Sequence, residues 1–210
     1  MIRNAILFRI LSSFQAQKMF RSSLRRMLST TGSAPDVYAK SLQWLHLLQA
    51  TAAIGAICSV NYAMRTPKTP EGEKQKNDAM FFHKSCGAFV AFTMPFRFIA
   101  RFATKIPPAL PAPAITQTAA SLVHASLYIG LTMMSFSGVA MAVASGRGLP
   151  FFFTTIQFSQ KPDPETAKSI YKNHKQFGYY FQFLVPIHIG GSAFHWVQGQ
   201  RILARMNPFI

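Results

Sequence analysis

The sequence has few acidic residues and little charge of either sign. Only six of its 210 residues are Asp or Glu, and 13% are charged, whereas soluble globular proteins carry about 25%. Half of the residues are hydrophobic and 20 are Phe, which excludes a disordered basic chain. The two Cys are too few for a disulfide framework and lack metal-site spacing. The formal charge of +16 comes without basic runs interleaved with aromatic residues, so nucleic acid is not the expected partner. The class that remains is a basic membrane protein.

Residues 1–33 differ in composition from the rest of the chain. They hold several Ser, no acidic residue and six basic residues, which are Arg3, Arg9, Lys18, Arg21, Arg25 and Arg26. An amphipathic N-terminus that is rich in Arg and Ser is typical of a mitochondrial transit peptide. The alternative is a basic helix that stays in the membrane interface. We therefore expect a transit peptide or interfacial helix at 1–33 and a membrane domain at 34–210, in the mitochondrial inner membrane.

Four later stretches are candidate membrane spans, since a spanning helix needs about 20 mostly apolar residues. They are residues 41–64, 81–104, 119–144 and 176–200. Prolines between 107 and 113 forbid a helix before the third span. If side A is the side that holds the N-terminus, the predicted loops 65–80 and 146–173 lie on the opposite side, side B.

The histidines are confined to these spans or their ends. The six are His46, His83, His124, His174, His188 and His195. Ionisable groups at membrane depth are costly and mark functional sites. His174 and His188 are 14 residues apart, which is about 21 Å of helix and nearly four turns. One helical face therefore presents an imidazole near each membrane surface. The partner at matching depth is His46 for His188 on side A, and His83 for His174 on side B.

Two imidazoles without a carboxylate or thiolate suit haem iron better than zinc. The fold class expected is thus all-α, a transmembrane four-helix bundle with cofactors in the bundle core. The alternative for each His is a hydrogen bond to a neighbouring helix, or a water-filled cavity.

Other residues are candidates for the surroundings of these cofactors. Gly87, Gly178 and Gly190 follow ligand histidines closely, where a flat porphyrin needs a backbone without side chains. Arg97 and Arg101 end the second span on side A, where haem propionates are expected. His124 and His195 are candidates for hydrogen bonds to a propionate or a quinone head group, with simple packing as the alternative. His195 also shares the face of His188 and is a substitute ligand candidate.

Several short motifs together resemble those of the bacterial cytochrome b561 family, which includes the b-type subunit of nickel hydrogenases. They are WLH at 44–46, HKSCG at 83–87, RFIAR at 97–101, PPALP at 107–111 and HASLY at 124–128, with Gly138, His174 and His188. The resemblance implies a four-helix bundle that binds two b haems, with His46, His83, His174 and His188 as axial ligands. It also implies electron exchange with ubiquinone, and superoxide oxidation in at least one branch.

The function expected is a di-haem b-type cytochrome that transfers electrons across or within the inner membrane, to or from ubiquinone. If superoxide is a donor, Lys84, Lys172 and Lys175 would attract it. Lipid and respiratory-complex subunits are the other expected partners. The alternative is a structural or anchor subunit of a respiratory complex that keeps this scaffold, with or without haem. A transporter with a His proton relay is disfavoured because no carboxylate lies within the spans.

Overall fold

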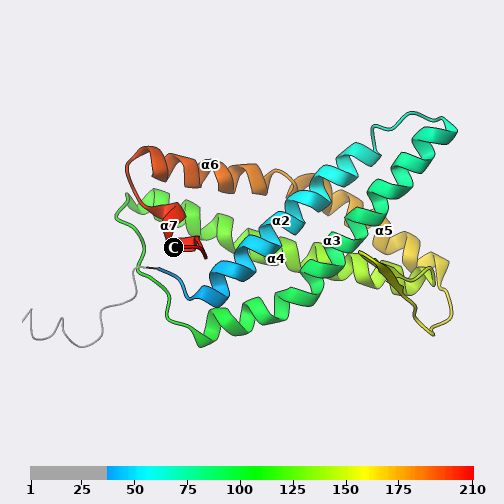
Figure 1. Cartoon of the computed structure of the whole chain (residues 1–210), viewed down its shortest axis with the longest axis horizontal. Helices are drawn as coiled ribbons and strands as arrows, with labels where there is room; N and C mark the ends of the chain where they lie inside the picture. Colours follow the sequence, from blue (N-terminus) through cyan, green and yellow to red (C-terminus); the bar gives the residue numbers. More distant parts are fainter. Residues whose placement is uncertain (1–36) are drawn as a thin grey trace, which may run out of the picture. The chain divides into compact units, whose positions relative to one another are not determined.

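The computed structural model describes residues 37–210. The predicted transit peptide at 1–33 lies outside the described residues. The first described helix, α2, spans Lys40–Ala63, α3 spans Pro70–Ala103 and α4 spans Ala114–Ser145. A short antiparallel hairpin of β1 (Leu149–Phe151) and β2 (Thr154–Ile156) follows. The chain then forms α5 (Pro164–Phe181), α6 (Leu184–Val197) and α7 (Ile202–Met206), as Figure 1 shows. The prediction of a predominantly helical fold is confirmed.

Helix α3 begins at Pro70, within the predicted loop 65–80. The prediction of a loop is therefore wrong from residue 70 onward. The Thr69 hydroxyl accepts a hydrogen bond from the Gly72 amide at 3.1 Å, and Pro70 occupies the first helical position. Glu71 and Glu73 lie in the first turn, where their negative charges interact favourably with the positive end of the helix dipole and stabilise the helix. The helix has 34 residues, about 51 Å of length, against a hydrocarbon core of about 30 Å. Its polar first part therefore extends beyond the apolar part.

The predicted fourth span, 176–200, is divided in the structure into α5 and α6. Pro186 has no N–H and cannot donate to the carbonyl of Gln182, so the helix is interrupted at Gln182 and Phe183. The Gln182 side chain accepts a hydrogen bond from Asn61 Nδ2 of α2 at 3.0 Å. The predicted loop 146–173 is also not irregular throughout, because it contains the hairpin and the first part of α5.

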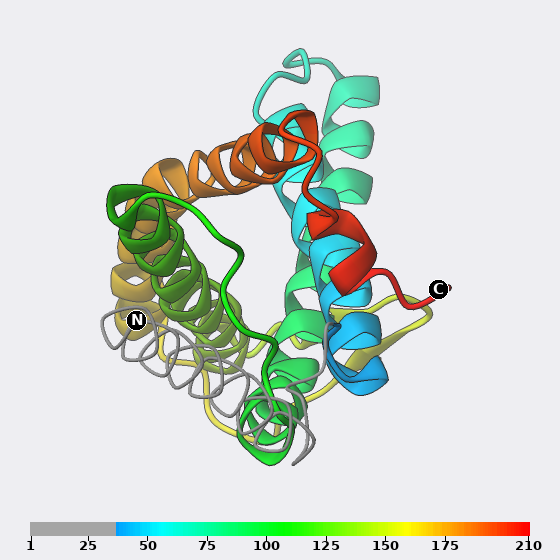
Figure 2. The same cartoon turned by 90° about the vertical axis from the view of Figure 1, so that its left-hand side faces the viewer.

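The helices pack around α3 and α4, which also contact each other. Helix α2 packs along α3, and α4 packs against α3, α5 and α6. Figure 2 shows α2 and α3 on one side of the described part of the chain and α4 and α5 on the other. One apolar cluster joins α2 to α3 through Ala52, Cys86, Val90 and Met94. The hairpin packs against the middle of α3, where the Phe152 amide donates to Ser85 Oγ at 3.0 Å.

Two of the described helices, α3 and α4, are long and apolar enough to cross a membrane by themselves. The sequence predicts four spans, and these two helices correspond to the second and the third. Helix α2 carries Gln43, His46, Gln49 and Asn61, which reduce its apolar character. Helices α5 and α6 have 18 and 14 residues, so each is short. Large apolar side chains nevertheless lie exposed on the outside of the helices, such as Phe92, Ile99, Phe102 and Ile115.

Candidate functional site

Two pairs of histidines face each other across different helices. His46 of α2 lies opposite His188 of α6, with ring centres 6.2 Å apart and an angle of 65° between the rings. His83 of α3 lies opposite His174 of α5, with ring centres 6.3 Å apart and an angle of 89°. The structure thus brings together both pairs that the sequence places at matching depth. Their role as metal ligands stays a prediction.

The separation of the rings fits a metal ion between them. An imidazole nitrogen binds a first-row metal at about 2.0–2.1 Å, so two trans imidazoles on one metal have ring centres about 6.2–6.5 Å apart. Both observed separations, 6.2 and 6.3 Å, lie in this range. Among residues 37–210, no group of three or more His, Cys, Asp or Glu is arranged to hold a metal ion. Each pair would supply two imidazole nitrogens, a donor set that suits an iron whose other ligands come from a macrocycle such as haem.

Hydrogen bonds fix the rings of the side-B pair. His83 Nδ1 lies 2.9 Å from the Ala56 carbonyl, which can only accept, so Nδ1 carries the proton. His174 Nδ1 lies 2.8 Å from Ser137 Oγ. Ser137 donates its own hydrogen to the Met134 carbonyl at 3.1 Å and therefore accepts from His174. In both rings this leaves Nε2 with the free lone pair that a metal requires.

A third imidazole accompanies the side-A pair. His124 of α4 lies with its ring centre 5.0 Å from that of His188, at an angle of 73°. The sequence placed His124 toward side A without identifying this neighbour. His195 has a different environment, because its Nδ1 is 2.7 Å from Gln200 Oε1. Gln200 in turn donates to the Pro111 carbonyl at 3.0 Å, so His195 contributes to the packing of the side-A connection.

The two arginines of α3 also lie at the side-A end. Arg97 donates from Nε to Tyr128 Oη at 3.2 Å and from Nη1 to Gln49 Oε1 at 3.1 Å. Its guanidinium lies over the Tyr128 ring, 5.2 Å from the centroid. Arg101 Nη1 is buried and has no hydrogen-bond partner. A buried donor on a charged group is costly when it is unpaired. This nitrogen therefore fits an anionic group such as a haem propionate.

The glycines fall into two classes. Around Gly87 and Gly190, an added Cβ would meet nothing within 4 Å, which agrees with the predicted space for a flat group. Gly178 is different, since an added Cβ would lie 3.0 Å from Met134 Cε. The expectation that Gly178 leaves room for a porphyrin is thus wrong. Its small size allows α5 to approach α4.

The sequence reasoning missed the polar residues that support these groups. Gln49, Tyr128 and Ser137 lie within apolar runs, and each contacts a predicted site residue. Gln49 follows His46 by three residues and Tyr128 follows His124 by four. This is the spacing of neighbours on one helix face. It is the signal in the sequence that could have identified Gln49 and Tyr128.

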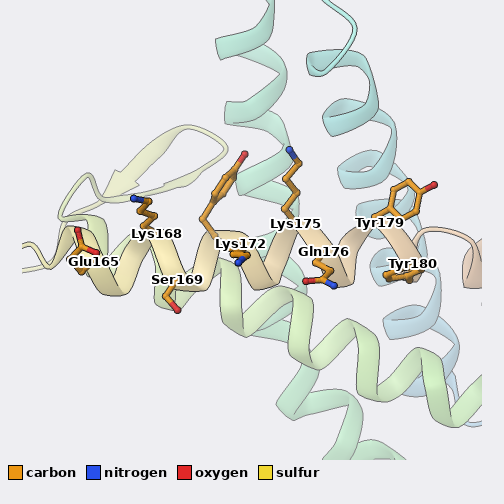
Figure 3. Close-up of a pocket in the computed structure, with 9 residues that line it drawn as sticks. Glu165, Lys168, Ser169, Lys172, Lys175, Gln176, Tyr179 and Tyr180 are labelled. Atoms are coloured by element: carbon orange, nitrogen blue, oxygen red, sulfur yellow. The ribbon is translucent and has the colours of Figure 1, made fainter.

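A separate hollow of about 860 Å³ lies along the surface of α5. Its lining includes Lys168, Lys172 and Lys175 together with Tyr171, Tyr179 and Tyr180. Figure 3 shows the labelled side chains projecting from successive turns of this helix. Two of the three lysines expected to attract an anionic donor, Lys172 and Lys175, are thus part of one basic surface.

A helical chain with apolar outer faces and two facing pairs of histidines has the features of a membrane cytochrome with b-type haem. The family model for prokaryotic cytochrome b561 matches residues 37–208, and the chain belongs to this family. It is also similar to cytochrome b561 homolog 1 of Escherichia coli (strain K12). The two are 30% identical over 128 residues, which are 60% of this chain and 73% of the relative. The family consists of membrane-embedded electron-transfer proteins that bind b-type haem.

Proposed function

We propose that this chain is a di-haem b-type cytochrome of the mitochondrial inner membrane that passes electrons between a donor at side B and ubiquinone. The observation that carries the proposal is the presence of two histidine pairs whose ring centres are 6.2 and 6.3 Å apart. Family membership supports haem and electron transfer in general. The number of haems, the quinone and the organelle are the parts that we add.

Four residues would hold the two haems. His46 and His188 would bind the iron on side A, and His83 and His174 the iron on side B. Haem supplies a one-electron couple whose potential depends on its axial ligands, its burial and the nearby charges. The protein contributes ring orientation, as Ala56 and Ser137 do for the side-B pair.

Further residues would hold the periphery of the haems. Arg101 offers its unpaired Nη1 to a propionate on side A, and Arg97 and His124 lie at the same end of the bundle. Gly87 and Gly190 leave open space beside their helices. His195, which is bonded to Gln200, is the weakest of the predicted cofactor contacts.

The proposed fold is a four-span bundle of α2, α3, α4 and the divided α5–α6 unit. Helices α3 and α4 have the length and composition of spans. The polar residues that make α2 less apolar, among them Gln43 and Gln49, are buried at 0% and 1% exposure. They face protein, so the lipid-facing surface of α2 stays apolar. Side A and side B would then be the two faces of the inner membrane.

The location rests on residues 1–33, whose composition is typical of a mitochondrial transit peptide. Because ubiquinone is the mobile carrier that the family resemblance implies, it is the acceptor or donor that we propose. The lysines along α5 favour an anionic donor such as superoxide at side B, since clustered positive charge raises the rate of encounter with anions.

The decisive experiment is a reduced-minus-oxidised spectrum with haem quantification on the purified chain. We expect an α-band and two haems per chain. His188→Ala should remove the side-A haem and leave one. Two haems at full stoichiometry in that variant would contradict the ligand assignment. A purified chain without an α-band would favour the alternative, a structural subunit of a respiratory complex.

A further inference from the structure

Helix α3 presents a different basic side chain at each level of the bundle. His83 lies at the side-B level, and Arg97 follows it by 14 residues on the same helix, which continues past Pro95. Fourteen residues are about 21 Å of rise and nearly four turns, so both side chains leave the helix in nearly the same direction. Where α3 contributes an imidazole to the side-B pair, it therefore contributes a guanidinium beside the side-A pair. Arg97 hydrogen-bonds Gln49 and Tyr128, which lie about one helical turn from His46 and His124 on their own helices.

Neutral groups hold this guanidinium in place. Gln49 and Tyr128 accept its hydrogen bonds at 3.1 and 3.2 Å. Gln49, which is 1% exposed, donates its own amide hydrogen to Thr93 Oγ1 at 3.0 Å. The network joins α2, α3 and α4 and fixes the position of Arg97. Its members carry no negative charge, so they orient the cation without neutralising it.

The acidic side chains of the described residues lie far from Arg97. Those in residues 37–210 are Glu71, Glu73, Asp78, Asp163 and Glu165. The first three belong to the first part of α3, and the other two to the start of α5. Asp78 precedes Arg97 by 19 residues, about 28 Å along the helix. The positive charge of Arg97 is therefore uncompensated by acidic side chains in the described part of the chain.

The side-B pair has a different electrostatic environment. The basic groups near this pair are Lys84, Lys172 and Lys175, whose side chains are all exposed and are therefore screened by water and salt. Asp78 lies five residues before His83 on the same helix. A half-buried guanidinium in a low-dielectric bundle acts more strongly than exposed ammonium groups do.

We infer that Arg97 raises the reduction potential at the His46–His188 site above that at the His83–His174 site, so that an electron received at side B comes to rest at side A. The inference rests on the proposed function, because it requires a haem at each pair. The physical cause is the charge of the iron, which falls by one on reduction, so a nearby cation stabilises the reduced form. The fold would thereby give electron transfer a direction, from the donor surface on side B toward side A.

Spectroelectrochemical titration of the full-length protein in detergent, wild type against Arg97→Gln, tests the inference. We expect one of the two transitions to move to lower potential and the other to stay. A tenfold change in the distribution of the electron, about 59 mV for a one-electron couple, is the order expected for a unit charge at an effective dielectric constant of about 20. Arg97→Lys, which keeps the charge and loses the planar fork, should leave most of the difference in place.

Two further variants serve as controls. Lys84→Gln removes a charge beside the side-B pair, and we expect a smaller shift because that group is exposed. In a His174→Ala background, which keeps the side-A haem alone, Arg97→Gln should lower the remaining potential. In a His188→Ala background it should leave the remaining potential unchanged.

The outcomes separate the inference from the proposed function. Two haems with unchanged potentials in Arg97→Gln, or equal shifts of both, would overturn the inference and leave the di-haem assignment intact. Equal effects of Arg97→Lys and Arg97→Gln would also overturn it, because they would indicate a structural role. A chain that binds no haem would overturn both.

Discussion

Ser137 of α4 accepts a hydrogen bond from His174 Nδ1 at 2.8 Å and donates its own to the Met134 carbonyl at 3.1 Å. This relation ties the ring of a proposed axial ligand on α5 to the backbone of another helix. It is the type of outer contact that orients imidazole ligands and raises their basicity.

Replacement of Ser137 by Ala should therefore weaken haem binding at the side-B pair. Loss of such outer contacts costs about 10–100-fold in metal affinity in other sites, and we expect an effect of that order. Haem transfer to an apo acceptor protein, followed by absorbance, measures it. Ser135→Ala is the matched control, since Ser135 bonds only to carbonyls of its own helix. Equal loss in both variants would contradict a specific role for Ser137.

Arg101→Met should have opposite effects on the chain with and without haem. Its buried Nη1 has no partner, so removal of the charge should stabilise the haem-free chain. The same variant should lose haem from side A more readily, because the propionate partner is gone. Thermal unfolding of both forms gives the two signs. Lys105→Met, an exposed cation at the same end, should change neither, and a stabilised haem-bound form of Arg101→Met would contradict the propionate assignment.

Bulk at Gly87 should exclude haem without harming the helix. An added Cβ meets nothing within 4 Å, so Gly87→Ala should leave the fold at least as stable, since Ala favours a helix by about 0.5–1 kcal/mol over Gly. Gly87→Leu extends further into the open space and should lower haem content at the side-B pair. Haem-to-protein ratios after purification test this, and full occupancy in Gly87→Leu would show that the space does not receive the cofactor.

Gly130→Ala should instead destabilise the folded chain. A Cβ there would clash with the ring of Phe181, so this ring, or the two helices α4 and α5, would have to shift. Overpacking of this kind costs about 1–3 kcal/mol. A lower midpoint of thermal unfolding is the expected result. An additional Phe181→Leu substitution should restore part of the loss, and a failure to do so would argue against this contact as the cause.

The start of α5 should be sensitive to acid. Hydrogen bonds from the Thr166 hydroxyl and amide hold the pKa of the Asp163 carboxyl below its usual value. The carboxylate therefore stabilises the helix start at pH values above its ordinary pKa, and this contribution is lost as the pH falls through the lowered value. Asp163→Asn caps without titrating, so its unfolding midpoint should depend less on pH below about 4. Parallel acid dependence in both proteins would contradict the assignment.

Sequence reasoning reached the helices and the histidine pairs but not all boundaries. The hydropathy pattern placed the second span at 81–104, whereas Thr69, Pro70 and Glu71 begin the helix 11 residues earlier. These cap residues begin the helix ahead of its apolar part. Pro186 likewise signalled the break between α5 and α6.

What the sequence alone determined is which histidines lie opposite each other. A helix rises about 1.5 Å per residue, so positions along an apolar stretch convert directly into levels in a bilayer, and equal levels define partners. The tertiary structure decided how the helices are rotated and how closely they approach. Those features depend on side-chain packing between residues far apart in the chain. They brought Ala56 to His83, Ser137 to His174, and the neutral partners Gln49 and Tyr128 to Arg97.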